Sequence, residues 1–263
     1  MSLPAPRPAP PAARLLDALA ADAPLVPPAL SGWWLNYLHQ QRSRYLDVVA
    51  LLRAELGESR GETAVLEVGS VPGHLTILLR QLGYAVQGVD LAPERLAALW
   101  QKYDLPVAKV DVESQPLPFA AGAFDLLLCN EVLEHLRVNP LYALREMRRV
   151  LRPGGRLLLS TPNITPLHRL KFLLGRSYQG DPVTEFQKLE WLGHMGHIRL
   201  YERREVVAML RAAGLTVTAA QTRGAYVARS WRTWPLLLLP RRDRLRPFLY
   251  LWAVPQEARR ALS

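Results

Sequence analysis

Short apolar runs alternate with helix-like segments beyond Gly61, and this alternation constrains the fold more than any other feature of the chain. Strands buried on both faces read as continuous apolar runs, and strands joined by helices form right-handed βαβ units in a mostly parallel sheet. The runs predict seven strands, over residues 64–68, 85–89, 107–110, 124–129, 156–160, 215–220 and 248–254. Helices are predicted over 74–82, 93–103, 140–151 and 202–213. The sequence therefore predicts an α/β fold with a seven-stranded, mostly parallel sheet.

The chain ahead of the sheet divides into two parts. Residues 1–29 are rich in proline and predict an extended arm around a short helix at 12–21. An apolar stripe with helical spacing predicts a long helix over 31–56, and the Trp33–Trp34 pair near its start is expected to pack. With 263 residues, we expect one domain over 30–263, built from this helix, a core at 61–161, an insertion at 162–201 and a C-terminal part at 202–263.

Composition narrows the class of protein. The single cysteine, Cys129, cannot form an intramolecular disulfide, which fits a reducing, cytoplasmic environment. No run approaches the roughly 18 apolar residues of a membrane span. The net charge of +10 is uneven, because most of the excess lies between Arg223 and Arg260, and such a cluster suits anionic partners.

Acidic residues end three successive predicted strands, at Glu67, Asp90 and Asp111. The first is followed by a loop with Gly69 and Gly73, where a missing Cβ lets a ligand approach the backbone. Open α/β sheets bind ligands at the carboxyl ends of their strands, and an acid after the second strand is placed to accept hydrogen bonds from ribose hydroxyls. We therefore expect a ligand that contains a ribose at this edge.

These motifs resemble the class I S-adenosylmethionine-dependent methyltransferases, which have a Rossmann-like fold, and within them the broad group of methyltransferase domains of types 11 and 12. The likeness covers about Val65 to Val217. It rests on Gly88-Val-Asp-Leu, Pro116-Leu-Pro-Phe, Phe124-Asp-Leu-Leu-Leu-Cys-Asn-Glu-Val-Leu-Glu-His and Val150-Leu-Arg-Pro-Gly-Gly. The stretch Leu167-His-Arg-Leu-Lys-Phe-Leu-Leu-Gly is similar to members associated with polysaccharide and glycolipid assembly.

The resemblance implies S-adenosyl-L-methionine as cofactor and assigns the residues that would hold it. The methionine end would be lined by Glu67, Gly69 and Gly73, the ribose would be held by Asp90, the adenine by Asp111 and Val112, and Asn130 would lie near the sulfonium; Leu91 is also expected to contact the cofactor. The chain departs from the family at the middle glycine of the loop, where it has Val71 followed by Pro72. The residue before a proline is pushed to extended angles, so we expect a stiffer loop that still binds cofactor; the alternative is weakened binding.

Methyl transfer needs an acceptor held in line with the methyl group and a base that takes its proton. His135 follows the fourth strand, and His194, His197 and Tyr201 follow the fifth at the same edge. We take His135 and His197 as the candidate catalytic residues. The expected reaction, with no metal, methylates an oxygen of a small-molecule, glycan or lipid-linked acceptor, and nucleic acid is the less favoured partner.

Two other functions stay open. The set Glu131, Glu134, His135 and His197 resembles the metal ligands of small-RNA 2′-O-methyltransferases, and two carboxylates with two imidazoles suit a Lewis-acidic divalent ion. The other alternative is a non-catalytic binding module, which Val71 alone supports.

The basic C-terminal region permits two interpretations. It combines Trp231, Trp234 and the apolar run 236–239 with Arg241, Arg242, Arg244 and Arg246. We expect a helix packed ahead of the last strand, because a parallel strand would need a helical crossover. The alternative is an interfacial anchor that holds the protein at an anionic membrane, at the inner face of the cell membrane.

Overall fold

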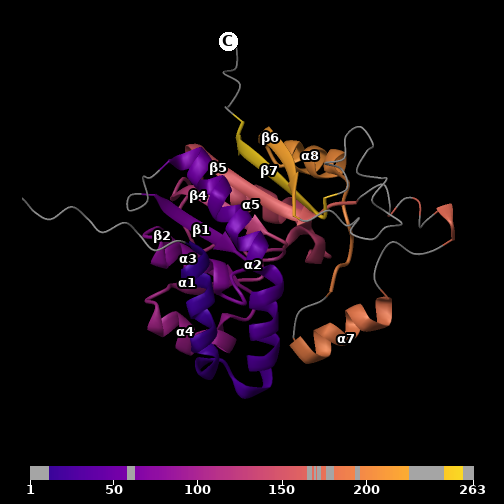
Figure 1. Cartoon of the computed structure of the whole chain (residues 1–263). Helices are drawn as coiled ribbons and strands as arrows, with labels where there is room; N and C mark the ends of the chain where they lie inside the picture. Colours follow the sequence, from indigo (N-terminus) through magenta and orange to yellow (C-terminus); the bar gives the residue numbers. More distant parts are fainter. Residues whose placement is uncertain are drawn as a thin grey trace, which may run out of the picture.

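A seven-stranded sheet crosses the molecule in the order β3-β2-β1-β4-β5-β7-β6 (Figure 1). The computed structural model describes residues 12–57, 63–164, 168, 170, 173–175, 181–192, 196–224 and 246–256. The strands are β1 (Ala64–Val68), β2 (Ala85–Asp90), β3 (Val107–Lys109), β4 (Phe124–Asn130), β5 (Leu151–Pro162), β6 (Leu215–Arg223) and β7 (Phe248–Pro255). Strands β1 to β5 pair in parallel, and β7 runs antiparallel to β5 and β6. The predicted α/β fold with a mostly parallel sheet is confirmed.

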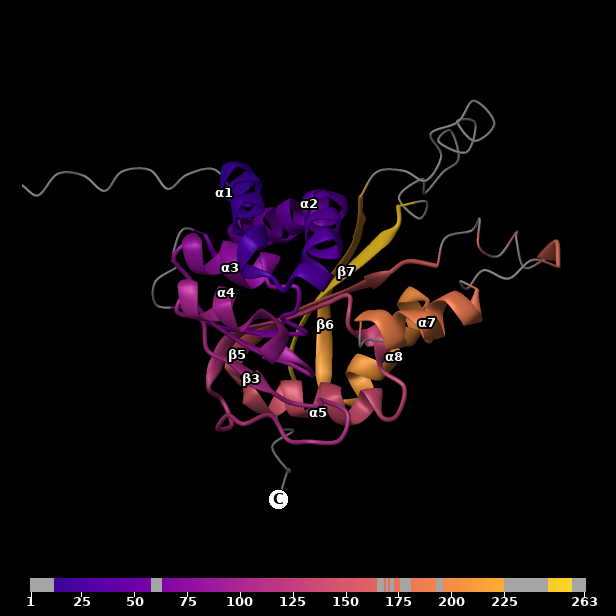
Figure 2. The same ribbon diagram turned by 90° about the horizontal axis from the view of Figure 1, so that it is seen from below.

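Helices cover both faces of this sheet. One face carries α1 (Ala12–Leu19), α2 (Pro28–Leu56), α3 (His74–Gln81) and α4 (Ala97–Lys102), and the other carries α5 (Pro140–Val150) and α8 (Arg203–Ala212) (Figure 2). α7 (Pro182–Leu192) lies to the side in both views. Three short 3-10 turns complete the described elements, at Ala20–Leu25, Pro93–Leu96 and Leu133–His135. Because both faces are covered, central residues such as Leu66 and Leu127 are fully buried.

The long helix α2 joins the first part of the chain to the sheet. It begins with Pro28 at its first turn and ends at Gly57, whose φ of 66° favours glycine. The predicted stripe is buried, with Trp34 and Leu52 fully enclosed. The Trp34 indole donates a hydrogen bond to the carbonyl oxygen of Pro72 at 2.8 Å. Trp34 therefore packs as predicted, and it also ties α2 to the loop after β1.

Three details differ from the sequence-based expectations. The helix expected at 93–103 is divided into a 3-10 turn and the short helix α4. β5 begins at Leu151, earlier than predicted, because Leu151 pairs with Phe124 ahead of a register shift. The expected need for a helical crossover ahead of the last strand was wrong, because β7 pairs antiparallel with β6, and an antiparallel neighbour needs no crossover. The residues that would form that helix, 231–245, lie outside the described ranges.

Among the described residues, no helix combines the length and the apolar character that a membrane span requires.

Candidate functional site

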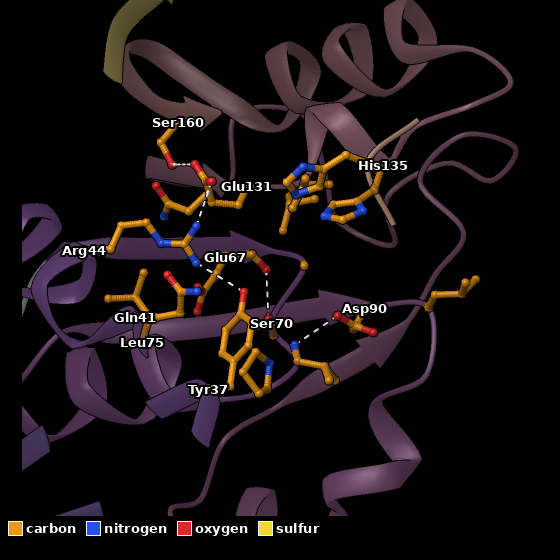
Figure 3. A pocket seen from close by; sticks show the side chains of 18 of the residues that line it. Tyr37, Gln41, Arg44, Glu67, Ser70, Leu75, Asp90, Glu131, His135 and Ser160 are labelled. Atoms are coloured by element: carbon orange, nitrogen blue, oxygen red, sulfur yellow. Dashed lines mark hydrogen bonds and ion pairs between the residues drawn. The ribbon is translucent and has the colours of Figure 1, made fainter. Parts of the chain in front are cut away.

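A cavity of about 880 Å³ opens at the carboxyl ends of β1, β2 and β4, with α2 along one side (Figure 3). The strand order runs one way from β1 to β3 and the other way from β4 onward, so β1 and β4 flank a topological switch point. Open α/β sheets bind ligands in such crevices. The volume lies within the range of small-molecule pockets.

The loop after β1 supplies the first wall. Gly69 and Gly73 have φ of 78° and 89°, a left-handed conformation that favours glycine. A Cβ on Gly69 would lie 2.4 Å from Val132 Cγ2, and one on Gly73 would lie 2.8 Å from the Trp100 ring. The space beside each glycine is thus filled by a neighbouring side chain. Backbone conformation and packing therefore both require glycine at these two positions, which also line the cavity.

Glu67 lies at the end of β1, almost completely buried. Its carboxyl group accepts a hydrogen bond from the Thr76 hydroxyl. Burial raises the pKa of Glu67 to about 8, and the nearby Asp90 acts in the same direction. Glu67 is therefore largely protonated near neutral pH and can itself donate a hydrogen bond.

Asp90 ends β2, at the position expected of a ribose-binding acid. Its two carboxylate oxygens accept hydrogen bonds from the backbone amides of Val71, at 2.9 Å, and Ala92, at 3.0 Å. Burial raises the pKa of Asp90, and these two amides oppose that rise. Each oxygen keeps a second lone pair for a ligand. Val71, the residue at the unusual loop position, is thereby fixed to the acid beside the pocket.

The predicted adenine end is more open. Asp111 follows β3, and its carboxylate accepts from the Glu113 amide at 3.1 Å and the Ser114 hydroxyl at 2.7 Å, which closes its own turn. Val112 lies beside it, half-buried. Leu91 also lines the cavity with 52% of its surface exposed, and a bound ring would cover that apolar surface.

Asn130 ends β4 in the middle of the cavity lining. Its amide nitrogen and oxygen are both buried, and neither has a hydrogen-bond partner within the described part of the chain. Buried polar groups in folded proteins are nearly always paired, so an orphaned amide in a pocket is a place where a ligand is expected to bind.

The two candidate catalytic histidines lie together. The rings of His135 and His197 are 5.1 Å apart between centroids, edge to face. His135 Nδ1 lies 3.2 Å from the carbonyl oxygen of Gly196, which holds the two loops against each other. The His197 side chain is exposed at the cavity mouth, and partial desolvation by the surrounding protein lowers its pKa, although the Glu131 charge acts in the opposite direction. His197 is therefore neutral near physiological pH and is able to accept a proton.

Glu134 lies below these histidines, fully buried. One carboxylate oxygen accepts from the Thr161 hydroxyl at 3.0 Å, and the other has no hydrogen-bond partner among the described residues. Burial, together with the charge of Glu131, raises its pKa well above the ordinary range. One ligand atom each from Glu134, His135 and His197 lies within 4.8 Å of the others, so three of the four residues in the metal-binding interpretation converge.

The fourth, Glu131, takes a different partner. Its Oε2 lies 2.7 Å from Arg44 Nη1, and its Oε1 accepts from the Ser160 hydroxyl at 3.0 Å (Figure 3). The Arg44 guanidinium also donates to the Tyr37 hydroxyl at 3.2 Å and lies over the Phe248 ring. Burial alone would lower the pKa of Arg44, but the Glu131 charge acting together with Tyr37 and Tyr45 outweighs it, and the pKa is raised. Glu131 itself adopts a φ of 54°, an uncommon conformation that recurs at functional sites.

Sequence reasoning did not identify the contribution of α2 to the site. Tyr37, Gln40, Gln41 and Arg44 line the cavity from one face of this helix. Their spacing of three, four and seven residues places them on one face of the helix, a polar pattern distinct from the apolar stripe on which the helix prediction rested. Tyr201, grouped with the histidines by sequence, packs in the core instead, and His194 lies outside the described residues.

Comparison with known proteins identifies relatives of the chain. Residues 37–220 match a family described as a methyltransferase domain. The ubiquinone biosynthesis O-methyltransferase of Xanthomonas oryzae pv. oryzae is 35% identical over 156 residues, which cover 56% of this chain and 62% of the relative. The protein of that name from Xanthomonas euvesicatoria pv. vesicatoria is 32% identical over 198 residues, 70% of this chain and 75% of the relative. The chain thus spans less than two thirds of the first relative.

Solved structures share the fold. The S-adenosylmethionine dependent methyltransferase of Mesorhizobium loti superposes with a TM-score of 0.53 at 20% identity, covering 78% of this chain and 95% of that one. A SAM dependent methyltransferase of Aquifex aeolicus gives a TM-score of 0.50 at 19% identity, covering 78% and 87%. At these identities the likeness establishes the fold alone.

Proposed function

The chain belongs to the S-adenosylmethionine-dependent methyltransferases with the class I Rossmann-like fold, and on that basis we propose that it methylates an oxygen of a small-molecule, glycan or lipid-linked acceptor. The observation that carries the proposal is the pairing of His135 and His197 beside Asn130 in a single cavity. The relatives named ubiquinone biosynthesis O-methyltransferase support oxygen as the acceptor atom.

The described residues fit the cofactor. Asp90 keeps free lone pairs for the two ribose hydroxyls, Leu91 and Val112 offer apolar surface to the adenine, and Asp111 lies near its amino group. The orphaned amide of Asn130 needs partners that the methionine end can supply. Glu67, Gly69 and Gly73 shape that end of the cavity. When bound, S-adenosylmethionine supplies a methyl group activated by its sulfonium charge.

The residues on the acceptor side then have two tasks. They must hold the acceptor oxygen in line with the methyl carbon, and they must take the proton that the hydroxyl group loses as the new carbon–oxygen bond forms. A neutral His197 is suited to take that proton, and the Glu131 charge would stabilise the imidazolium that results. His135, held by Gly196, would keep His197 in place.

The proposal is tested with the purified full chain and a panel of hydroxylated, aminated and thiol-bearing acceptors. Formation of S-adenosylhomocysteine with hydroxylated acceptors alone would support it. Turnover of amines alone would overturn the oxygen assignment. Absence of S-adenosylhomocysteine binding would favour the non-catalytic module instead.

A metal-dependent RNA 2′-O-methyltransferase is a second candidate. The convergence of Glu134, His135 and His197, with one unpartnered carboxylate oxygen, favours it. The Glu131 ion pair with Arg44 counts against it, because a four-ligand site would have to break that pair. Loss of turnover in a chelator, restored by a divalent ion, would raise this candidate above the first.

A further inference from the structure

A second hollow of about 1290 Å³ lies next to the catalytic cavity, and five arginines line it. We call it the arginine groove; its arginines are Arg203, Arg204 and Arg211 from α8, Arg223 at the end of β6, and Arg246 just before β7. Among the described residues, only two carboxylates, Asp47 and Glu202, line it with them. A cleft lined by one sign of charge concentrates its field and attracts ligands of the opposite sign.

Part of this positive charge is not neutralised by the protein. Arg204 pairs with Glu202 at 2.8 Å and Arg223 with Asp47 at 3.3 Å. The Arg203 and Arg211 side chains are exposed, and they make no ion pair or hydrogen bond with any residue that the structure describes. The amides at the start of α8 are already capped by Glu202, so the side chains rather than the helix end would meet an anion.

The arginine groove and the catalytic cavity share a wall. Asn163 lines both, and its side-chain amide donates to the backbone oxygen of Arg246 at 2.8 Å. On α2, Arg44 and Val48 line the cavity while Ser43 and Asp47 line the groove. At the start of β7, Pro247 and Phe248 line the cavity while Arg246 and Leu249 line the groove. The two hollows therefore adjoin at the carboxyl end of β5, with Asn163 in the lining of both.

We propose that the arginine groove binds the phosphate or diphosphate group of the acceptor while its hydroxyl group lies in the catalytic cavity. Arginine is suited to this role because its planar fork donates paired hydrogen bonds to phosphate oxygens. The inference rests on the proposed function, and it narrows the acceptor to a phosphate-bearing molecule. A lipid-linked diphosphate and a soluble nucleotide diphosphate share this chemistry.

The test measures binding of inorganic pyrophosphate to the full chain by calorimetry at low ionic strength. The variant Arg203→Gln/Arg211→Gln removes the two unpaired groove arginines. The control variant Arg53→Gln/Arg145→Gln removes two exposed helical arginines outside the groove, with the same change in net charge. We expect affinity to fall about tenfold or more in the groove variant and to stay within about twofold in the control, because each charged hydrogen bond is worth roughly a factor of ten.

Binding to vesicles of phosphatidylglycerol distinguishes a lipid-linked phosphate group from a soluble one. If the wild type binds pyrophosphate but not vesicles, the groove takes a soluble phosphate. If the wild type binds both and the groove variant loses both, the groove takes a lipid-linked phosphate. An equal loss in the control variant, or vesicle binding without pyrophosphate binding, would overturn the proposal. S-adenosylhomocysteine binding is measured alongside and should be equal in all three proteins. Absence of S-adenosylhomocysteine binding in the wild type would count against the proposed function, whereas the pyrophosphate measurement would still test the arginine groove.

Discussion

Arg44 and Glu131 form a buried ion pair, with Nη1 and Oε2 2.7 Å apart, that joins the first long helix to the end of the central strand β4. The side chains are only 10% and 7% exposed. Both side chains line the cavity, so the helix that precedes the sheet forms part of the site (Figure 3).

Breaking this pair should destabilise the fold. In Arg44→Met, the Glu131 carboxylate loses its counter-charge inside the protein, and we expect a loss of about 3–5 kcal/mol in the free energy of unfolding. Urea denaturation measures it. The double variant Arg44→Met/Glu131→Gln should recover much of the loss, because no buried charge is then left alone. Lys109→Met, which breaks an exposed pair with Glu94, serves as control and should cost about 0–1 kcal/mol. Equal losses in both single variants would contradict the assignment.

Asp90→Ala should weaken binding of S-adenosylmethionine and S-adenosylhomocysteine. The ribose hydroxyls would lose their acceptor and the Val71 amide would lose its partner, at a cost of about 1–3 kcal/mol in binding. Calorimetry gives the two affinities. Asp17→Ala, an exposed acid paired with Arg42 away from the cavity, is the matched control. Unchanged affinity in Asp90→Ala would remove Asp90 from the ribose site.

Glu67 should make stability fall as the pH rises. Its pKa is about 8 in the folded protein against 4.5 for the ordinary group, so between these values the folded state holds a proton that the unfolded state has lost. Unfolding then becomes easier with rising pH, by at most about 1.4 kcal/mol per pH unit from this group, and the effect levels off above about pH 8. Comparing urea unfolding of the wild type and Glu67→Gln across this window isolates the effect. Parallel curves for the two proteins would show that Glu67 is not protonated.

His197→Gln should lower kcat by about 10²–10⁴-fold while S-adenosylhomocysteine binds as before, because the base acts on the acceptor. Because the pKa of His197 is lowered from the ordinary value of 6.5, the midpoint of the acid limb in the wild-type kcat profile should lie below pH 6.5. His39→Gln, an exposed histidine on α2, is the control. A variant with normal kcat and a raised KM would make His197 a positioning residue.

Chelation should leave turnover intact if the oxygen-directed reaction proceeds without a metal. Glu131, which a four-ligand site would need, is bound to Arg44 and Ser160. Activity is measured after dialysis against EDTA, and cobalt absorption bands report any ion held by Glu134, His135 and His197. Activity that disappears in EDTA and returns with manganese would reverse the order of the two candidate functions.

The sequence predicted what depends on local pattern. Apolar runs located the seven strands that the structure describes, most clearly the central ones such as β4, whose two faces are both covered. Acids after strands located Glu67 and Asp90, because the ends of parallel strands meet at one edge. The sequence also placed His135 and His197 at that edge, and in the structure their rings lie 5.1 Å apart.

Other features depend on contacts between distant segments. Arg44 lies 87 positions before Glu131 in the sequence. Nothing in the local pattern of α2 indicates that Arg44 has a buried ion-pair partner. The direction of β7 was also beyond local pattern, because strand orientation is set by pairing with β5 and β6. The space beside Gly69 is decided by Val132, a residue of another loop.

The hydrogen bond from Trp34 to Pro72 limits where the chain can be truncated without disturbing the cavity loop. The family match begins at residue 37, after Trp34, yet that indole holds the loop on which Asp90 and Val71 also converge. A fragment trimmed to the homologous boundary would expose the hollow left by a fully buried tryptophan and release the loop carbonyl. The packed core therefore extends upstream of the matched region, to where α1 and the following turn pack on α2.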